Sequence, residues 1–319
     1  MHISRNFEYP SQLEQKFRKA KKLEWITLFY FSSAVFFIIL VMGSSQTMKT
    51  AWLEDALSLI PPASFLISSR IYVKGSDQNF PYGYHRVISI AFLISAVALT
   101  TVGSFLFIDS ALTLIKSERP TISTIEVAGH QVWMGYIMIL VLLYSTIPSM
   151  ILGIKKKPLA EDLLEKNLYT DAQMNKADWL SGLSAVAGII GIGIGWYWAD
   201  AVAAIIISFD IMHDGFSYLR QAVFDLMNQI PKLIQNKKED PIFDKIKKEV
   251  EKESWIKTSG IRFRQEGHIY FGEVFIVPAR EDRLTERMEL LKKKLLELNW
   301  RVFDVTLTLV KELDPEKAK

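Results

Sequence analysis

Long apolar blocks separated by short polar segments dominate the chain up to about residue 220. A bilayer core of about 30 Å requires about 20 mostly apolar residues in one helix, and six segments meet that requirement. They are Trp25–Gly43, Ala51–Val73, Val87–Ile115, Val132–Ile154, Ala172–Ile194 and Trp196–Leu219. The pattern predicts an α-helical membrane protein, with an N-terminal arm at 1–24 and a six-helix transmembrane bundle at 25–220. Pro61 and Pro62 interrupt the second segment, where we expect a kink.

The pattern changes after Pro231. A charged linker, 221–239, precedes shorter alternating segments at 240–319. We expect a helix starting at Asp240-Pro241 and ending near Ser254, strands at Lys257–Gln265 and His268–Val277, a helix at Arg280–Asn299, and a strand at Arg301–Val310. This order, α-β-β-α-β, predicts a small cytoplasmic α+β domain of ferredoxin or metallochaperone type. In its last strand Phe303, Val305, Leu307 and Leu309 alternate with polar residues, which predicts one buried face.

Basic residues in the short loops predict the orientation in the membrane. They gather in the N-terminal arm, in the loop between the second and third segments, and at Lys155–Lys157 between the fourth and fifth. Cytoplasmic loops carry the excess of lysine and arginine. We therefore expect an integral membrane protein with both termini in the cytoplasm, in a prokaryotic inner (plasma) membrane.

Composition narrows the function classes. Half of the 319 residues are hydrophobic, and the chain has no cysteine, which excludes disulfides and thiolate metal ligands. The formal net charge of +3 is too small to suggest a nucleic-acid partner. The sequence contains no nucleophile–base arrangement and no phosphate loop, so an enzyme is not expected.

The fifth apolar segment carries the most informative polar residues. Asp171, Asn175 and Asp178 share one face of a helix. A charge inside a membrane costs about 2.5–3.5 kcal/mol and usually faces a bundle interior or an ion path. Asp178 is therefore interpreted as functional. Asp171 could equally cap the helix, and Asn175 could equally bond a neighbouring helix.

Three local motifs resemble those of one transporter family. Asp171, Met174 and Asp178, followed by Ser181-Gly182, are similar to an aspartate and a His-x-x-x-Asp pair before small residues. Tyr82–Arg86 and Ala199-Asp200 resemble the elements that lead into the third and sixth spans. Together with the order of elements along nearly the whole chain, they resemble the cation diffusion facilitator family. The resemblance implies a homodimeric metal exporter that exchanges a divalent cation for protons, with the metal as substrate and no cofactor.

The resemblance also implies a transport site, which this chain alters. Two oxygen ligands would fall on Glu54 and Ser58, opposite Met174 and Asp178. A thioether is a soft neutral ligand and a serine hydroxyl a weak one. Further oxygen groups are available on Asp171, Asn175, Asp55 and Asp210. This oxygen-rich set favours a harder cation, manganese, iron or magnesium, over zinc.

Several alternatives stay open at this point. Glu54 could lie at the membrane surface, and Asp210 could pair with His213 or with a basic residue. Zinc is the alternative substrate. A non-transporting scaffold or heteromeric partner, with a degenerate metal site, is the alternative function.

Two accessory sites implied by the resemblance lack their histidines. Asp77 and Asp304 match ligand positions, whereas Phe80, Tyr84, Ser259 and Phe275 stand where histidines are expected. We expect the C-terminal domain to fold and dimerise without a zinc cluster. His268 is expected in a solvent-facing turn.

Overall fold

The computed structural model of the protein describes residues 9–41, 46–116, 124–127, 130–194, 196, 199–233 and 238–313. The chain divides into two compact units. The first, called the helical unit here, comprises Gln15–Arg70 and Ile90–Ala222. The second, called the mixed unit, comprises Met1–Glu14, Ile71–Ser89 and Val223–Lys319. The expected fold class is confirmed: the chain is mostly helical and has a small C-terminal domain built on a sheet.

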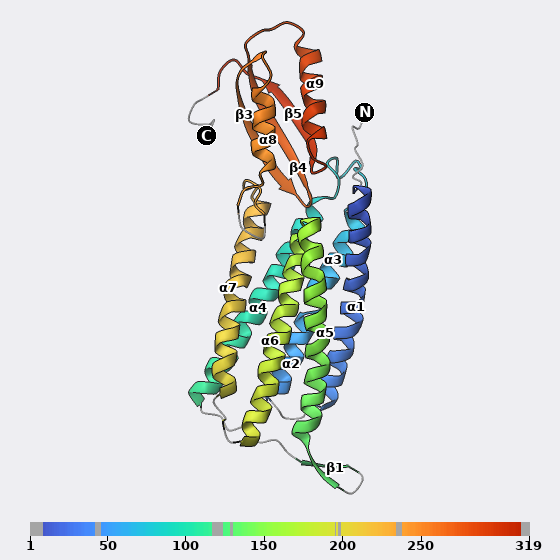
Figure 1. Ribbon diagram of the computed structural model, residues 1–319, viewed down its shortest axis with the longest axis vertical. Coiled ribbons are helices and arrows are strands. Elements are labelled where there is room, and N and C mark those ends of the chain that lie inside the picture. Colours follow the sequence, from blue (N-terminus) through green and yellow to red (C-terminus); the bar gives the residue numbers. More distant parts are fainter. Residues whose placement is uncertain are drawn as a thin grey trace. The chain divides into compact units, whose positions relative to one another are not determined.

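In the described part of the chain, seven helices supply the helical unit (Figure 1). They are α1 (Ser11–Val41), α2 (Gln46–Leu57), α3 (Ile60–Ile71), α4 (Arg86–Lys116), α5 (Met134–Leu163), α6 (Lys166–Ile194) and α7 (Ala199–Leu226). Among the described residues, α1, α4 and α5 are long and apolar enough to cross a membrane. The full count of six spans therefore stays a prediction.

Several helices extend beyond their apolar blocks, which corrects the expected boundaries. Helix α1 begins at Ser11, within the expected arm, and α5 runs to Leu163. Lys155–Lys157 thus belong to a helix, and their assignment to a loop was wrong. A hairpin of β1 (Thr124–Val127) and β2 (His130–Trp133), which the apolar pattern did not indicate, precedes α5. The connection between the fifth and sixth segments lies outside the described residues, except Trp196.

The second apolar segment is divided into two helices. Helix α2 ends at Leu57 and α3 begins at Ile60. Pro61 and Pro62 therefore occupy the first turn of α3, where the missing amide hydrogen of proline removes no helical bond. The helix is therefore interrupted before the two prolines, which lie in the first turn of α3.

Helices α4 and α7 touch through their backbones at two glycines. A Cβ atom added to Gly103 would lie 2.6 Å from the amide nitrogen of Met212. One added to Gly215 would lie 2.7 Å from the Cα atom of Thr100. Only glycine permits so close an approach at these positions, so α4 and α7 form a tight pair.

The mixed unit is built on a three-stranded sheet (Figure 1). Strands β3 (Ile256–Glu266) and β4 (Ile269–Pro278) form an antiparallel hairpin, and β5 (Val302–Leu309) lies parallel to β4. Helices α8 (Ile242–Glu251) and α9 (Leu284–Glu297) pack their apolar sides against one face of the sheet. Ile246, Leu291 and Leu295 are central to this core.

The alternation predicted for the last strand was partly wrong. Val302 and Val305 belong to the core beneath α8 and α9. Phe303 lies in a separate cluster with Ile269 and Phe271. The pairing of β4 with β5 shifts between Tyr270 and Phe271, so residues of β5 do not follow a strict two-residue period.

The segment Ile71–Ser89 packs against Phe271 and Phe303. The ring of His85 lies 5.2 Å from that of Phe303, and Tyr82 lies 6.0 Å from Phe271. The amide of Gly267 donates a hydrogen bond to Ser89 Oγ at 3.3 Å. The next residue, His268, lies in the turn between β3 and β4, as expected. It is only 2% exposed and packs against aromatic rings, so the expected exposure to solvent was wrong.

Candidate cation site in the helical unit

Asp178 lies on α6 and is buried. Ser58 Oγ donates a hydrogen bond to its Oδ1 atom at 2.7 Å. The second carboxylate oxygen, Oδ2, is buried and accepts no hydrogen bond from any described residue. A buried carboxylate oxygen without a donor is costly unless it binds a cation or a proton. Asp178 therefore has one oxygen suited to a ligand.

Two acidic residues of α2 are buried close to α6. Ser181 Oγ donates to Glu54 Oε1 at 2.5 Å and also lies 3.2 Å from the carbonyl oxygen of Asp178. Glu54 is thus held by the helix that carries Asp178, and it is not a surface residue of the described structure. Asp55 Oδ2 accepts a hydrogen bond from Ser145 Oγ of α5 at 2.6 Å.

Met174 and Asn175 occupy the turn of α6 before Asp178, and both are fully buried. Asn175 Nδ2 donates to the carbonyl oxygen of Asp171 at 2.8 Å. Its Oδ1 atom accepts no hydrogen bond from any described residue. Asn175 therefore bonds its own helix through its amide nitrogen and keeps an oxygen available.

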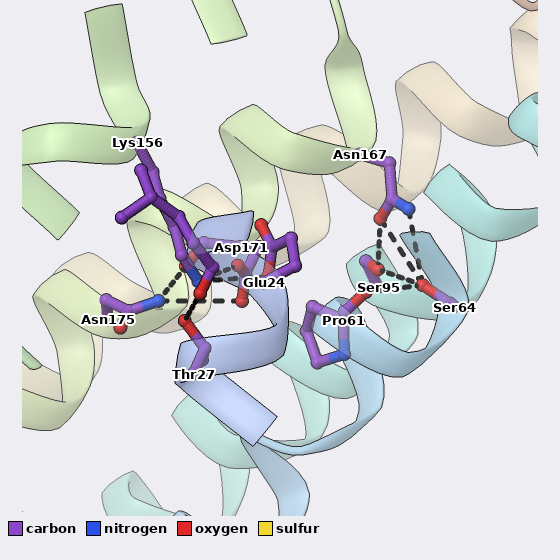
Figure 2. A network of polar contacts seen from close by, with 10 residues as sticks. Glu24, Thr27, Pro61, Ser64, Ser95, Lys156, Asn167, Asp171 and Asn175 are labelled. Carbon is purple, nitrogen blue, oxygen red and sulfur yellow. Dashed lines mark hydrogen bonds and ion pairs between the residues drawn. The ribbon is translucent and has the colours of Figure 1, made fainter. Parts of the chain in front are cut away.

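Asp171 belongs to a buried ion-pair group (Figure 2). Lys156 Nζ of α5 contacts Asp171 Oδ2 and lies 3.1 Å from Glu24 Oε2 of α1. None of the three side chains is exposed to solvent. The sequence interpretation missed Glu24 and Lys156, although Lys156 continues the buried face of α5 set by Leu152 and Ala160 at four-residue spacing.

Asp210 lies apart from this group, on the surface of α7. Its side chain is 64% exposed and pairs with Lys176 of α6 at 3.4 Å. The structure therefore joins Asp178 to Ser58 directly and to Glu54 through Ser181, whereas Asp55 is bonded to α5. Asp171 and Asp210 are each paired with a lysine.

A second buried polar cluster joins α3, α4 and α6 (Figure 2). Ser95 Oγ donates to Asn167 Oδ1, and Asn167 Nδ2 donates to Ser64 Oγ at 3.3 Å. Ser64 also donates to the carbonyl oxygen of Pro61 at 2.8 Å. These neutral groups satisfy one another and leave no carboxylate for a cation.

The polar side-chain atoms gathered around Asp178 are nearly all oxygen atoms. Within the described ranges, no three acidic or histidine side chains are grouped closely enough to hold a metal ion. A cation at Asp178 would therefore need hydroxyl or amide oxygens besides carboxylates. Oxygen-rich shells of this kind are what manganese, magnesium and calcium accept readily.

The accessory positions outside the helices have other roles. Asp77 Oδ1 accepts the amides of Asn79 and Phe80 at 2.8 Å, and Tyr84 donates to Oδ2 at 2.6 Å. The bond from Tyr84 and the backbone amides lower the pKa of Asp77. Asp77 thus closes a turn.

The remaining accessory residues are engaged with neighbours in the mixed unit. Asp304 pairs with Lys292 at 3.1 Å, and Phe275 lies beneath the guanidinium of Arg262.

Burial, followed by the charge of His268, lowers the pKa of His85 to about 4.

Long apolar helices that enclose buried carboxylates define a membrane protein that handles cations. The family described as the cation efflux transmembrane domain matches residues 25–227. The chain belongs to this family, the cation diffusion facilitators, whose members are transporters and not enzymes.

Three relatives belong to the same family. The chain is 24% identical to the manganese efflux system protein MneS of Bacillus subtilis (strain 168) over 61% of its own length and 63% of that protein. It is 25% identical to the manganese efflux system protein MneP of the same organism, over 72% of this chain and 75% of MneP. It is also 25% identical to the magnetosome protein MamB of Magnetospirillum gryphiswaldense, over 60% of each protein. The match thus spans less than two thirds of MneS and MamB.

Proposed function

We propose that this protein exports a divalent cation, with a preference for manganese over zinc, in exchange for protons. The observation that carries the proposal is the set of three buried carboxylates, Glu54, Asp55 and Asp178, each bonded by a serine hydroxyl. A hydroxyl donor orients a carboxylate and leaves its negative charge in place. The similarity to two manganese efflux proteins supports the choice of manganese.

The proposed ligands are Asp178 and Glu54, with Ser58, Asn175 and Met174 completing the shell and Asp55 in reserve. Facing carboxylates repel one another when charged, and a divalent cation or a proton relieves that repulsion. Cation and proton would then compete for one site, which is the basis of exchange. Asp171 and Asp210 would join the shell only when their pairs with lysine open.

The proposal extends to assembly and orientation. Two copies would associate through the C-terminal domain, with no zinc cluster there. Both termini would face the cytoplasm of a prokaryotic cell. A zinc substrate is the alternative that the transport assay tests directly.

The decisive experiment is flux in liposomes. Purified protein should move Mn²⁺ against its gradient when a pH gradient is imposed, and faster than Zn²⁺. Asp178→Asn should abolish the flux, because it removes the charge and retains the shape and the acceptor for Ser58. Asp162→Asn, the same change at an exposed residue paired with Lys16, is the matched control. Full transport by Asp178→Asn would refute the proposal, and manganese binding without flux would favour a non-transporting partner.

A further inference from the structure

The ammonium group of Lys156 occupies a position that resembles a cation site. It lies between the carboxylates of Glu24 and Asp171, which come from α1 and α6 (Figure 2). All three side chains are fully buried. Because the contacts come from three helices, the position is enclosed by the bundle.

The oxygen atoms around Lys156 exceed what its charge requires. Two carboxylate groups face one ammonium group, so the position offers four carboxylate oxygen atoms to a single cation. Glu24 Oε1 is buried and accepts no hydrogen bond from any described residue. An ion pair that only joined two helices would need one carboxylate. This surplus of oxygen atoms matches the requirement of a divalent ion, which prefers several carboxylate oxygens.

We propose that Lys156 is a tethered cation that fills a second cation position, formed by Glu24 and Asp171, and thereby excludes a divalent ion from it. Lys156 then determines how many metal ions the helical unit holds. The proposal rests on the contacts of these three residues and goes beyond transport at Asp178.

The first test counts bound metal. Full-length protein in nanodiscs is dialysed against Mn²⁺ alone, and bound manganese per protomer is measured by mass spectrometry. Lys156→Met removes the ammonium group and keeps an unbranched side chain, so it should bind one more ion than the unmodified protein. The control variant Glu24→Gln/Lys156→Met/Asp171→Asn removes the carboxylates as well, so it should not bind that ion. An unchanged count in Lys156→Met, or an extra ion retained by the control, would overturn the proposal.

The second test measures thermal stability and applies if Lys156→Met folds poorly. Removing the ammonium leaves two buried carboxylates uncompensated, which destabilises a bundle strongly. Mn²⁺ should then raise the unfolding midpoint of Lys156→Met, followed by tryptophan fluorescence, more than it raises that of the neutral control, since ligands stabilise the state that binds them. Lys156→Arg keeps the charge and should gain no ion. Failure of Mn²⁺ to stabilise Lys156→Met would equally refute the assignment.

The outcome is independent of the proposed transport function. The double variant Lys156→Met/Asp178→Asn should keep the additional ion, because Asp178 lies two turns farther along α6. If the unmodified protein carried no manganese flux and Lys156→Met still gained one ion, the transport proposal would fail and this one would stand.

Discussion

Replacing Met174 by histidine should shift the cation preference toward zinc. Met174 is fully buried on α6, one turn before Asp178, and side chains four residues apart on a helix are neighbours. An imidazole there would lie beside the carboxylate of Asp178. Imidazole suits zinc, and zinc binds such sites more tightly than manganese does.

The expected size of the effect follows from burial. Without metal, an imidazole in this enclosed position costs about 1–3 kcal/mol in folding stability, because a buried ring nitrogen lacks a partner. Coordination of zinc offsets that cost. We expect the ratio of zinc to manganese affinity to rise about 10- to 100-fold, which corresponds to about 1.4–2.8 kcal/mol.

Calorimetric titration of each cation in nanodiscs would measure this ratio. Met174→Leu is the matched control: it keeps the volume, removes the sulfur and should cost less than about 1.5 kcal/mol of stability. A folded Met174→His variant with an unchanged ratio would refute the placement of residue 174 beside the cation. Loss of manganese binding in Met174→Leu would show instead that the thioether itself is a ligand.

Three further predictions follow from individual contacts. Ser58→Ala removes the donor to Asp178 Oδ1 and should weaken manganese binding about 10- to 100-fold in the same titration, as loss of an orienting bond commonly does. Gly103→Ala should destabilise the protein by about 1–3 kcal/mol in thermal unfolding, because its Cβ would meet backbone of α7 at 2.6 Å; Gly191→Ala, where the nearest atom is 3.2 Å away, should cost less. Burial lowers the pKa of His85 from 6.5 to about 4. As the pH falls, His85 is therefore protonated in the unfolded chain before it is protonated in the folded protein. Stability should therefore fall by up to about 3 kcal/mol as the pH drops from 6.5 to 4, and His85→Leu should remove this dependence.

Local periodicity predicted the elements of this fold well and their ends less well. Apolar blocks located α4 and α5 because a membrane helix must cover its backbone with apolar side chains over the full bilayer thickness. The same rule cannot locate the ends of the helices, since a helix continues into water for as long as its residues permit. This is why Lys155–Lys157 were assigned to a loop although α5 includes them.

The candidate site was predictable along one helix and unpredictable between helices. The spacing of Asp171, Asn175 and Asp178 placed them on one face of α6, because helical geometry fixes that relation. Which side chain of another helix meets each of them depends on helix rotation and crossing. A rotation of α2 about its axis by part of a turn would make Asp55, in place of Glu54, face α6. Likewise, no pattern in the sequence indicates that Lys156 contacts Asp171.

The partner of each carboxylate therefore decides its chemistry more than its position in the sequence does. Asp178 and Glu54 receive hydrogen bonds from neutral hydroxyl groups, which hold an oxygen in place and leave the full negative charge to attract a cation. Asp171 and Asp210 contact lysine ammonium groups, which already compensate the carboxylate charge in the absence of a metal ion. Acidic residues that look equivalent in the sequence thus fall into two classes. The hydroxyl-bonded class is the one able to bind a divalent ion without first breaking an ion pair.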